Sequence, residues 1–171
     1  MSIYKYVFIF CVFFVCCEKN DFHTWQLCNG SELIDNELSV LSFNRLNGTS
    51  IHSVSKVIET VNPDVIGLQE SFDVGVEIAD RFNYCFYGDE ATSLAILSKY
   101  PIEVINDWQF KINLNDIDYI NFFNIHLPGH PYQPYDIRDT LITTSSQAIH
   151  QAEQTRGQYV NELVSYINSI D

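Results

Sequence analysis

Short apolar runs that end in polar residues alternate with helical segments, and this order constrains the fold more than any other feature of the chain. Residues 38–43 form one apolar run that ends at Asn44, and residues 65–68 form a second that leads to Glu70. Between them, residues 51–61 carry apolar side chains at helical spacing. A strand, a helix and a second strand in this order predict an α/β chain.

The remaining sequence extends this pattern. We expect a helix over residues 74–82, strands over 84–87, 93–98, 102–110 and 119–125, a loop over 126–139 and a helix over 145–170. Consecutive strands after a strand–helix–strand unit predict a mixed sheet. The length of 171 residues suits one domain, which we place at residues 38–171 behind an irregular lead-in at residues 18–37.

The net charge of the chain disfavours one class of function, the binding of nucleic acid through bulk charge. The chain has 22 acidic and 9 basic side chains and a formal net charge of -13. Nucleic-acid binding through bulk charge needs a basic surface, so this charge disfavours it. An enzyme that reaches a phosphate through bound cations is compatible with the charge, because an acidic site attracts cations.

Residues 1–17 have the pattern of an export signal. Lys5 precedes an apolar run of 12 residues from Tyr6 to Cys17, whereas a membrane-spanning helix needs about 20. We therefore expect a signal peptide and an exported protein, which is secreted, periplasmic or lipid-anchored at the cell surface. Two alternatives stay open: an uncleaved anchor, and a lipidated bacterial N-terminus at Cys17, although Phe14 stands where such signals usually have Leu.

Two of the five cysteines, Cys28 and Cys85, lie outside this leader. In an oxidising compartment they could form one disulfide, and two unrelated thiols are the alternative. The sequence has no CxxC and no Cys/His metal spacing, so we do not expect a structural zinc site.

Three polar residues end predicted strands: Asn44, Glu70 and His126. In open α/β sheets, functional sites gather at the carboxyl ends of the strands. A carboxylate at position 70 is well placed to bind a hard divalent cation such as Mg²⁺ or Mn²⁺, which prefers oxygen ligands. A capping or surface role for Glu70 is the alternative.

Asn124 lies two residues before His126, so both side chains project from the same face of a strand. An asparagine at this position can orient the histidine ring. The alternative is a hydrogen-bonded histidine with a structural role only.

The following loop contains Tyr132 and Tyr135 between prolines. Proline restricts the backbone and lowers the entropy cost of presenting a side chain. The two rings suit the rim of a substrate site, and packing beneath the loop is the alternative.

Five segments together resemble, in order, the endonuclease/exonuclease/phosphatase superfamily. They are LSVLSFN, NPDVIGLQES, SLAILSKYPIE, INFFNIHLP and AEQTRGQYVNELV. The resemblance runs from about Leu38 to the C-terminus. That family includes pancreatic-type deoxyribonucleases, apurinic endonucleases, inositol polyphosphate phosphatases and neutral sphingomyelinases.

The resemblance implies a four-layer α/β/β/α sandwich and Mg²⁺-dependent cleavage of a phosphate ester by water. By motif, Glu70 in LQE is the metal carboxylate, and Asn44 lies near metal and phosphate. His126 in N-x-H-L contacts the phosphate and stabilises developing charge, and Asn124 supports it. Bound metal polarises the phosphoryl oxygen or stabilises the leaving oxygen.

The chain also departs from the family pattern, because it contains neither G-D-F-N nor S-D-H. The family uses these segments to position and activate the attacking water. We therefore expect the N-terminal portion of the sandwich, with the C-terminal part missing, as a truncated chain inactive alone. The alternative is a non-catalytic remnant or binding module of the same fold.

The substrate is only partly constrained by sequence. The acidic charge favours a small phosphate ester, a lipid headgroup or a nucleotide over duplex DNA. Other expected partners are a membrane, contacted through the N-terminus, and either the missing C-terminal half or a protein that covers the open sheet.

Overall fold

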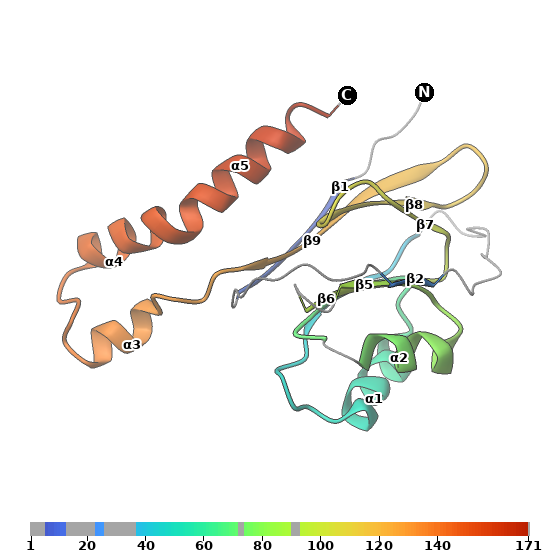
Figure 1. Cartoon of the computed structure of the whole chain (residues 1–171), viewed down its shortest axis with the longest axis horizontal. Helices are drawn as coiled ribbons and strands as arrows, with labels where there is room; N and C mark the ends of the chain where they lie inside the picture. Colours follow the sequence, from blue (N-terminus) through green and yellow to red (C-terminus); the bar gives the residue numbers. More distant parts are fainter. Residues whose placement is uncertain (1–5, 13–22, 26–36, 72–73, 90–92, 171) are drawn as a thin grey trace. The chain divides into compact units, whose positions relative to one another are not determined.

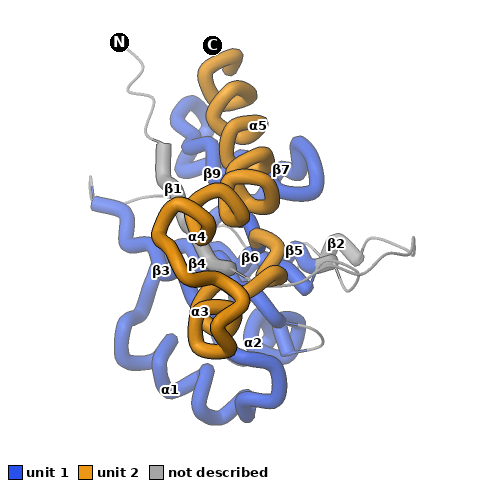
Figure 2. The backbone as a smooth tube through the Cα atoms, turned by 90° about the vertical axis from the view of Figure 1, so that its left-hand side faces the viewer, with its two compact units in different colours: residues 1–11, 16–126 blue, residues 12–15, 127–171 orange. Residues whose placement is uncertain are grey.

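The computed structural model describes residues 6–12, 23–25, 37–71, 74–89 and 93–170. The chain forms two compact units whose boundary lies between His126 and Leu127 (Figure 2). The sequence predicted one domain over residues 38–171.

The strands and helices follow the expected order (Figure 1). The strands are β1 (Tyr6–Val12), β2 (His23–Trp25), β3 (Val40–Asn44), β4 (Val65–Gln69), β5 (Cys85–Asp89), β6 (Leu94–Ser98), β7 (Ile102–Val104), β8 (Gln109–Asn113) and β9 (Tyr119–Leu127). The helices are α1 (Ile51–Val61), α2 (Val74–Phe82), α3 (Gln133–Arg138), α4 (Ser145–Ala152) and α5 (Gln158–Ile167), with a π-helical turn at Glu153–Gly157.

The strands form two sheets. The five-stranded sheet has the order β2-β5-β6-β4-β3, and the four-stranded sheet has the order β1-β9-β8-β7. Strands β3 and β4 are parallel, whereas β4 pairs with β6 in antiparallel orientation. The larger sheet is therefore mixed, and the chain is α/β as predicted.

Two apolar clusters organise the first unit into layers. One cluster joins the two sheets and includes Ile96 of β6 with Phe110 and Phe122 of the smaller sheet. The other joins the opposite face of the five-stranded sheet to α1 and α2, with Ile58 and Ile78 in its centre. Figure 1 shows both helices on this face. The first unit is thus a helix layer on a sheet on a second sheet, which matches three layers of the predicted sandwich.

Helix α1 begins and ends where the sequence predicts. Ser50 caps its N-terminus, because the hydroxyl accepts a hydrogen bond from the Ser53 amide. Asn62 closes its C-terminus in the left-handed conformation, with a φ of 47°. Pro63 then prevents the helix from continuing.

The predicted strand over residues 102–110 is wrong in one respect, because it is two strands, β7 and β8. The side-chain oxygen of Asn106 accepts hydrogen bonds from the amides of Trp108 and Gln109, at 3.1 and 2.8 Å. This asparagine turn reverses the chain within the segment that was predicted as one strand. The polar loop after β8 uses the same device, with Asn115 as the acceptor for Ile117.

Two segments that the sequence predicted to be irregular contain regular structure. Residues 133–138 of the proline-rich loop form α3, because Pro134 occupies the first turn, where proline is tolerated. Residues 23–25 of the lead-in form β2, which pairs with β5.

Residues 6–12 of the predicted signal peptide form β1 at the edge of the smaller sheet. The other residues of that segment lie outside the described residues, and the signal peptide stays a prediction. No helix in the described ranges is long and apolar enough to cross a membrane. Cys85 is disulfide-bonded; Cys28, the partner considered from the sequence, lies outside the described residues.

The predicted C-terminal helix is confirmed, with an interruption at residues 153–157. This π-helical turn carries Arg156, which donates hydrogen bonds to the side-chain oxygen of Gln133 and to the carbonyl of Pro128. Gln133 in turn donates to Gln151 at 2.9 Å. The π-helical turn therefore lies where hydrogen bonds join α3 to the C-terminal helical segment formed by α4 and α5.

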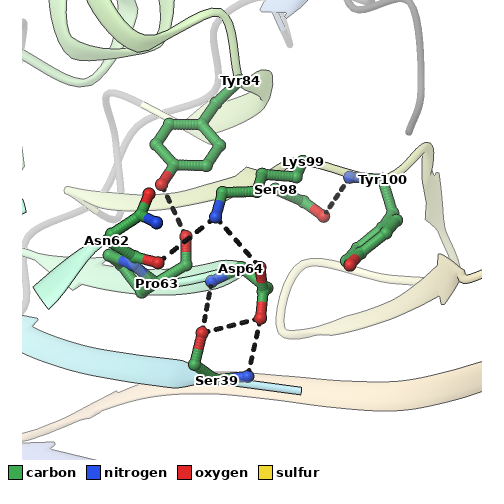
Figure 3. Close-up of polar contacts among 8 residues, drawn as sticks. All are labelled: Ser39, Asn62, Pro63, Asp64, Tyr84, Ser98, Lys99 and Tyr100. Carbon is green, nitrogen blue, oxygen red and sulfur yellow. Dashed lines mark hydrogen bonds and ion pairs between the residues drawn. The ribbon is translucent and has the colours of Figure 1, made fainter. Parts of the chain in front are cut away.

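A polar network closes the end of the five-stranded sheet where β3 and β4 begin (Figure 3). The carboxylate of Asp64 accepts hydrogen bonds from the Ser39 hydroxyl and amide, at 2.6 and 2.8 Å, and contacts Lys99 Nζ at 3.0 Å. The hydroxyl of Tyr84 donates to the carbonyl of Pro63 at 2.6 Å. These contacts join residues from four segments of the first unit.

This network shifts the pKa values of Asp64, Tyr84 and Tyr100, and the pKa of Tyr100 is raised by burial and by the charge of Asp64. Partial burial raises the pKa of Asp64, but the hydrogen bonds from Ser39 and the contact with Lys99 outweigh it, so the net pKa is lowered from 3.8. Burial, helped by the negative charge of Asp64, raises the pKa of Tyr84 to about 12. The network therefore favours an ionised Asp64 and a neutral Tyr84.

We expect Asp64→Asn to destabilise the protein at pH 7 by about 1–3 kcal/mol, because it weakens hydrogen bonds to a charged group. The folded pKa of Asp64 is lowered, so its contribution is fully present above pH 3.8 and is lost as the pH falls below that value. Urea unfolding between pH 7 and pH 2.5 measures both effects.

Asp80→Asn is the matched control, because Asp80 is exposed on α2. The control should unfold like the wild type throughout. Equal acid sensitivity in the wild type and Asp64→Asn would contradict the assignment.

Candidate functional site

Three strand ends bring the predicted polar residues together. Strands β3 and β4 are parallel, and Asn44 lies opposite Gln69, which places Glu70 next to Asn44. His126 comes from β9 of the other sheet. Asn44 Nδ2 donates to Glu70 Oε1 at 2.9 Å, and His126 Nε2 lies 3.9 Å from the same oxygen. The three residues that the sequence singled out therefore form one cluster.

The Glu70 carboxylate is held at both oxygens. Oε1 accepts from Asn44, and Oε2 accepts from the main-chain amide of Asn47 at 2.7 Å. The other end of the Asn44 side chain is also fixed, because its oxygen accepts from the Leu46 amide at 2.9 Å. Only 16% of the Glu70 side chain and 6% of the His126 side chain are exposed. Each oxygen still has lone pairs for a further partner.

The backbone of Glu70 is in the left-handed conformation, with a φ of 54°. A residue with a Cβ adopts this conformation only at a cost, and such residues cluster at functional sites. Here the left-handed residue turns the chain immediately after β4, so that the carboxylate points back toward the turn that follows β3.

Asn124 makes its hydrogen bonds across the two sheets. Its amide nitrogen donates to the carbonyls of Leu68 and Ala95, at 3.0 and 3.1 Å, and its oxygen accepts from Gln69 Nε2 at 2.7 Å. The side chain is fully buried. It therefore joins β9 to β4 and β6, and any effect on His126 passes through the position of the strand.

Gly67 provides the space for the Asn124 side chain between the two sheets. A Cβ at position 67 would lie 3.1 Å from Asn124 Oδ1 and 3.4 Å from the Phe122 ring. The Asn124 amide thus occupies the volume that a side chain on the facing strand would need.

Sequence reasoning missed Arg45, Asn47 and Gln69. Arg45 contacts the main chain of Glu70, Asn47 binds the Glu70 carboxylate through its amide, and Gln69 binds Asn124. The available signal was position alone, because all three lie within three residues of Asn44 or Glu70. The contact made by Asn47 uses a main-chain group, which no side-chain pattern reveals.

The predicted rim residues Tyr132 and Tyr135 belong to the second unit. Their rings meet edge to face with centroids 4.6 Å apart, and the Arg138 guanidinium lies 4.8 Å from the Tyr135 centroid. Tyr135 is 53% exposed. A role at a substrate rim stays a prediction for both.

Glu70 offers a carboxylate, the kind of oxygen ligand that hard divalent cations prefer. No group of three or more His, Cys, Asp or Glu side chains converges within the described ranges, so the residues do not form a protein cage. Mg²⁺ is commonly held by one or two carboxylates and keeps several waters. Glu70 has the chemistry for that mode of binding, with a side-chain amide and an imidazole beside it.

A helix layer, a mixed sheet and a second sheet, with a carboxylate, an amide and an imidazole at the strand ends, define a layered α/β protein with a polar cluster at one edge of its sheets. Residues 40–155 match the model of the endonuclease/exonuclease/phosphatase family. This match covers more than half of the chain, and the protein belongs to that family. The sequence-based prediction of the family is therefore confirmed.

One similar solved structure is the crystal structure of TDP2 from C. elegans. It is 20% identical, with a TM-score of 0.44, and the match covers 70% of this chain and 44% of that chain. The chain therefore matches less than half the length of that structure. No curated protein sequence gives a significant match.

We expect Asn124→Leu to destabilise the protein by about 2–4 kcal/mol, because it leaves two buried carbonyls and the Gln69 amide without this partner. Urea unfolding at pH 7 measures the change. Asn121→Leu is a matched control on the other face of β9, where the side chain accepts one hydrogen bond from Gln109. An equal loss of unfolding free energy in the two variants would contradict the special role of Asn124 in joining the two sheets.

Proposed function

We propose that the protein binds a divalent metal ion at Glu70 and acts on phosphate esters as a metal-dependent phosphoesterase. The observation that carries the proposal is the Glu70 carboxylate, fixed at both oxygens beside His126 in a member of this family. A partly buried carboxylate at a strand end, in a chain of net charge -13, favours a bound cation.

In this proposal each residue of the cluster has a distinct task. Glu70 binds the ion, and Asn44 holds the carboxylate in one orientation. His126 donates a hydrogen bond from its imidazole to a phosphate oxygen and stabilises the charge that develops there. The ion, when bound, polarises the phosphoryl oxygen or stabilises the leaving oxygen.

The substrate we propose is a small phosphate ester, a lipid headgroup or a nucleotide. The net charge repels a long polyanion such as duplex DNA, and it does so more strongly at low salt.

We also propose that the protein is exported, either secreted, periplasmic or lipid-anchored. The leader-like residues 1–17 and the disulfide at Cys85 both support an oxidising compartment. N-terminal sequencing of the mature protein tests this, and a mature chain that keeps Met1 in a reducing compartment would contradict it.

Binding without hydrolysis is the alternative function. The 171 residues contain neither the G-D-F-N nor the S-D-H segment to which the family resemblance assigns activation of water. Loss of a general base typically slows catalysis by about 10²–10⁴-fold. We therefore expect slow hydrolysis by this chain alone, and metal binding is the more direct test of the site.

Glu70→Gln should weaken Mn²⁺ binding at least about tenfold, because it removes the negative charge of the proposed ligand while keeping its shape. Isothermal titration with Mn²⁺ at pH 7 measures the change in affinity. Glu59→Gln, on the exposed surface of α1, is the matched control and should bind like the wild type. A wild type that binds no Mn²⁺, or a Glu70→Gln variant that binds it equally well, would contradict the proposed function.

His126→Gln should leave Mn²⁺ affinity within about threefold and lower the rate of hydrolysis of bis-p-nitrophenyl phosphate by about 10²-fold or more. The reason is that His126 is proposed to act on the phosphate and Glu70 on the metal. His150→Gln, on the exposed surface of α4, is the control. Metal binding without turnover in the wild type would favour the binding module.

A further inference from the structure

We infer that Arg45 is the positioning residue that fixes the proposed metal carboxylate of Glu70. The inference rests on the proposed function, and it concerns how the site is held. Arg45 is a buried cation, with 5% of its surface exposed. Burial of a guanidinium is costly unless its donors are satisfied, so its contacts indicate what it is buried for.

Arg45 ties the turn after β3 to the main chain of Glu70. Its Nε donates to the Glu70 carbonyl at 2.5 Å, and its Nη1 donates to the Thr49 carbonyl at 3.0 Å. The main-chain amide of Arg45 also donates to the Gln69 carbonyl at 3.2 Å. One residue thus connects both ends of the turn over residues 45–49 with the end of β4.

The turn that Arg45 holds is the one that binds the Glu70 carboxylate. Asn44 and the Asn47 amide each donate to one oxygen of that carboxylate. The backbone of Glu70 and its side chain are therefore bound to the same turn, the backbone through Arg45 and the side chain through Asn44 and Asn47. Displacement of the turn would move both contacts together.

Strain in the backbone explains why such a tie is needed. Leu46 and Glu70 both lie in the left-handed region, with φ values of 55° and 54°. Strained residues of this kind persist only where the surrounding structure fixes them. Leu46 is 70% exposed, so its side chain contributes little packing to the turn. The buried guanidinium supplies the contacts that packing does not.

The shape of the guanidinium matters as well as its charge. Its planar fork holds Nε and Nη1 in fixed directions, which lets one side chain reach two carbonyls at once. A lysine has one flexible donor group and cannot reproduce both bonds with the same geometry. Arg45→Lys should therefore restore only part of the function that Arg45→Met removes.

The test uses the full chain and three variants. Arg45→Met removes the guanidinium at similar length, and Arg45→Lys keeps the charge. Arg81→Met is the matched control, because Arg81 is exposed on α2 and pairs with Glu59. Mn²⁺ affinity by titration calorimetry and the amide hydrogen exchange of Asn47 by NMR are measured on folded protein, verified by thermal unfolding.

We expect Arg45→Met to weaken Mn²⁺ binding about 10–100-fold, the usual effect of removing a group that orients a metal ligand. Arg45→Lys should be intermediate, and Arg81→Met should bind like the wild type. The Asn47 amide should exchange at least about tenfold faster in Arg45→Met, because its carboxylate partner is no longer fixed. The Ile66 amide, in the buried strand β4, should keep its protection.

Two results would overturn the inference while the proposed function stands: wild-type affinity in Arg45→Met, or an Asn47 amide that stays equally protected. If Arg45→Met does not fold, the same two results in Arg45→Lys decide. If the wild type binds no Mn²⁺, the proposed function fails. The exchange of Asn47 then still decides whether Arg45 positions the carboxylate, because that measurement needs no metal.

Discussion

The buried amide of Asn124 is the interaction on which the candidate site depends. It joins β9 of one sheet to β4 and β6 of the other through three hydrogen bonds. Because β4 leads to Glu70 and β9 carries His126, the same amide sets how close the carboxylate and the imidazole lie. Their separation of 3.9 Å thus depends on how the two sheets pack, as well as on the turn over residues 45–49 that binds the carboxylate.

Strand β4 is held by different chemistry at its two ends. At its beginning, Asp64 binds Ser39 and Lys99, and this network fixes the register of β3 beside β4 (Figure 3). At its far end, Glu70 adopts a strained backbone that the turn over residues 45–49 maintains. The firmly anchored end allows the other end to hold a costly conformation, because the strand between them is fully buried and cannot shift.

Sequence reasoning located most elements and singled out the three residues that lie together around Glu70, because strand ends and helices follow local patterns. Helix α1 is predicted by the helical spacing of its apolar residues and by Ser50 and Asn62 at its ends. The end of a strand is recognised where an apolar run stops. The division of residues 102–110 was missed because an Asx turn needs only one asparagine, and the segment contains no glycine or proline to mark a turn. The contacts of Arg45 and Asn124 join residues far apart in sequence or use main-chain groups. The periodicity of apolar residues therefore cannot predict them.

The close approach of Gly67 and Asn124 has a consequence for how this sequence can change. The two positions share one volume between the sheets, so the residue that fits at one position depends on the residue at the other. Any side chain at position 67 must displace the amide at 124, and a smaller residue at 124 would free space but abandon three hydrogen bonds. A change at position 67 is therefore tolerated only as far as the Asn124 amide can move without losing its hydrogen bonds to β4 and β6.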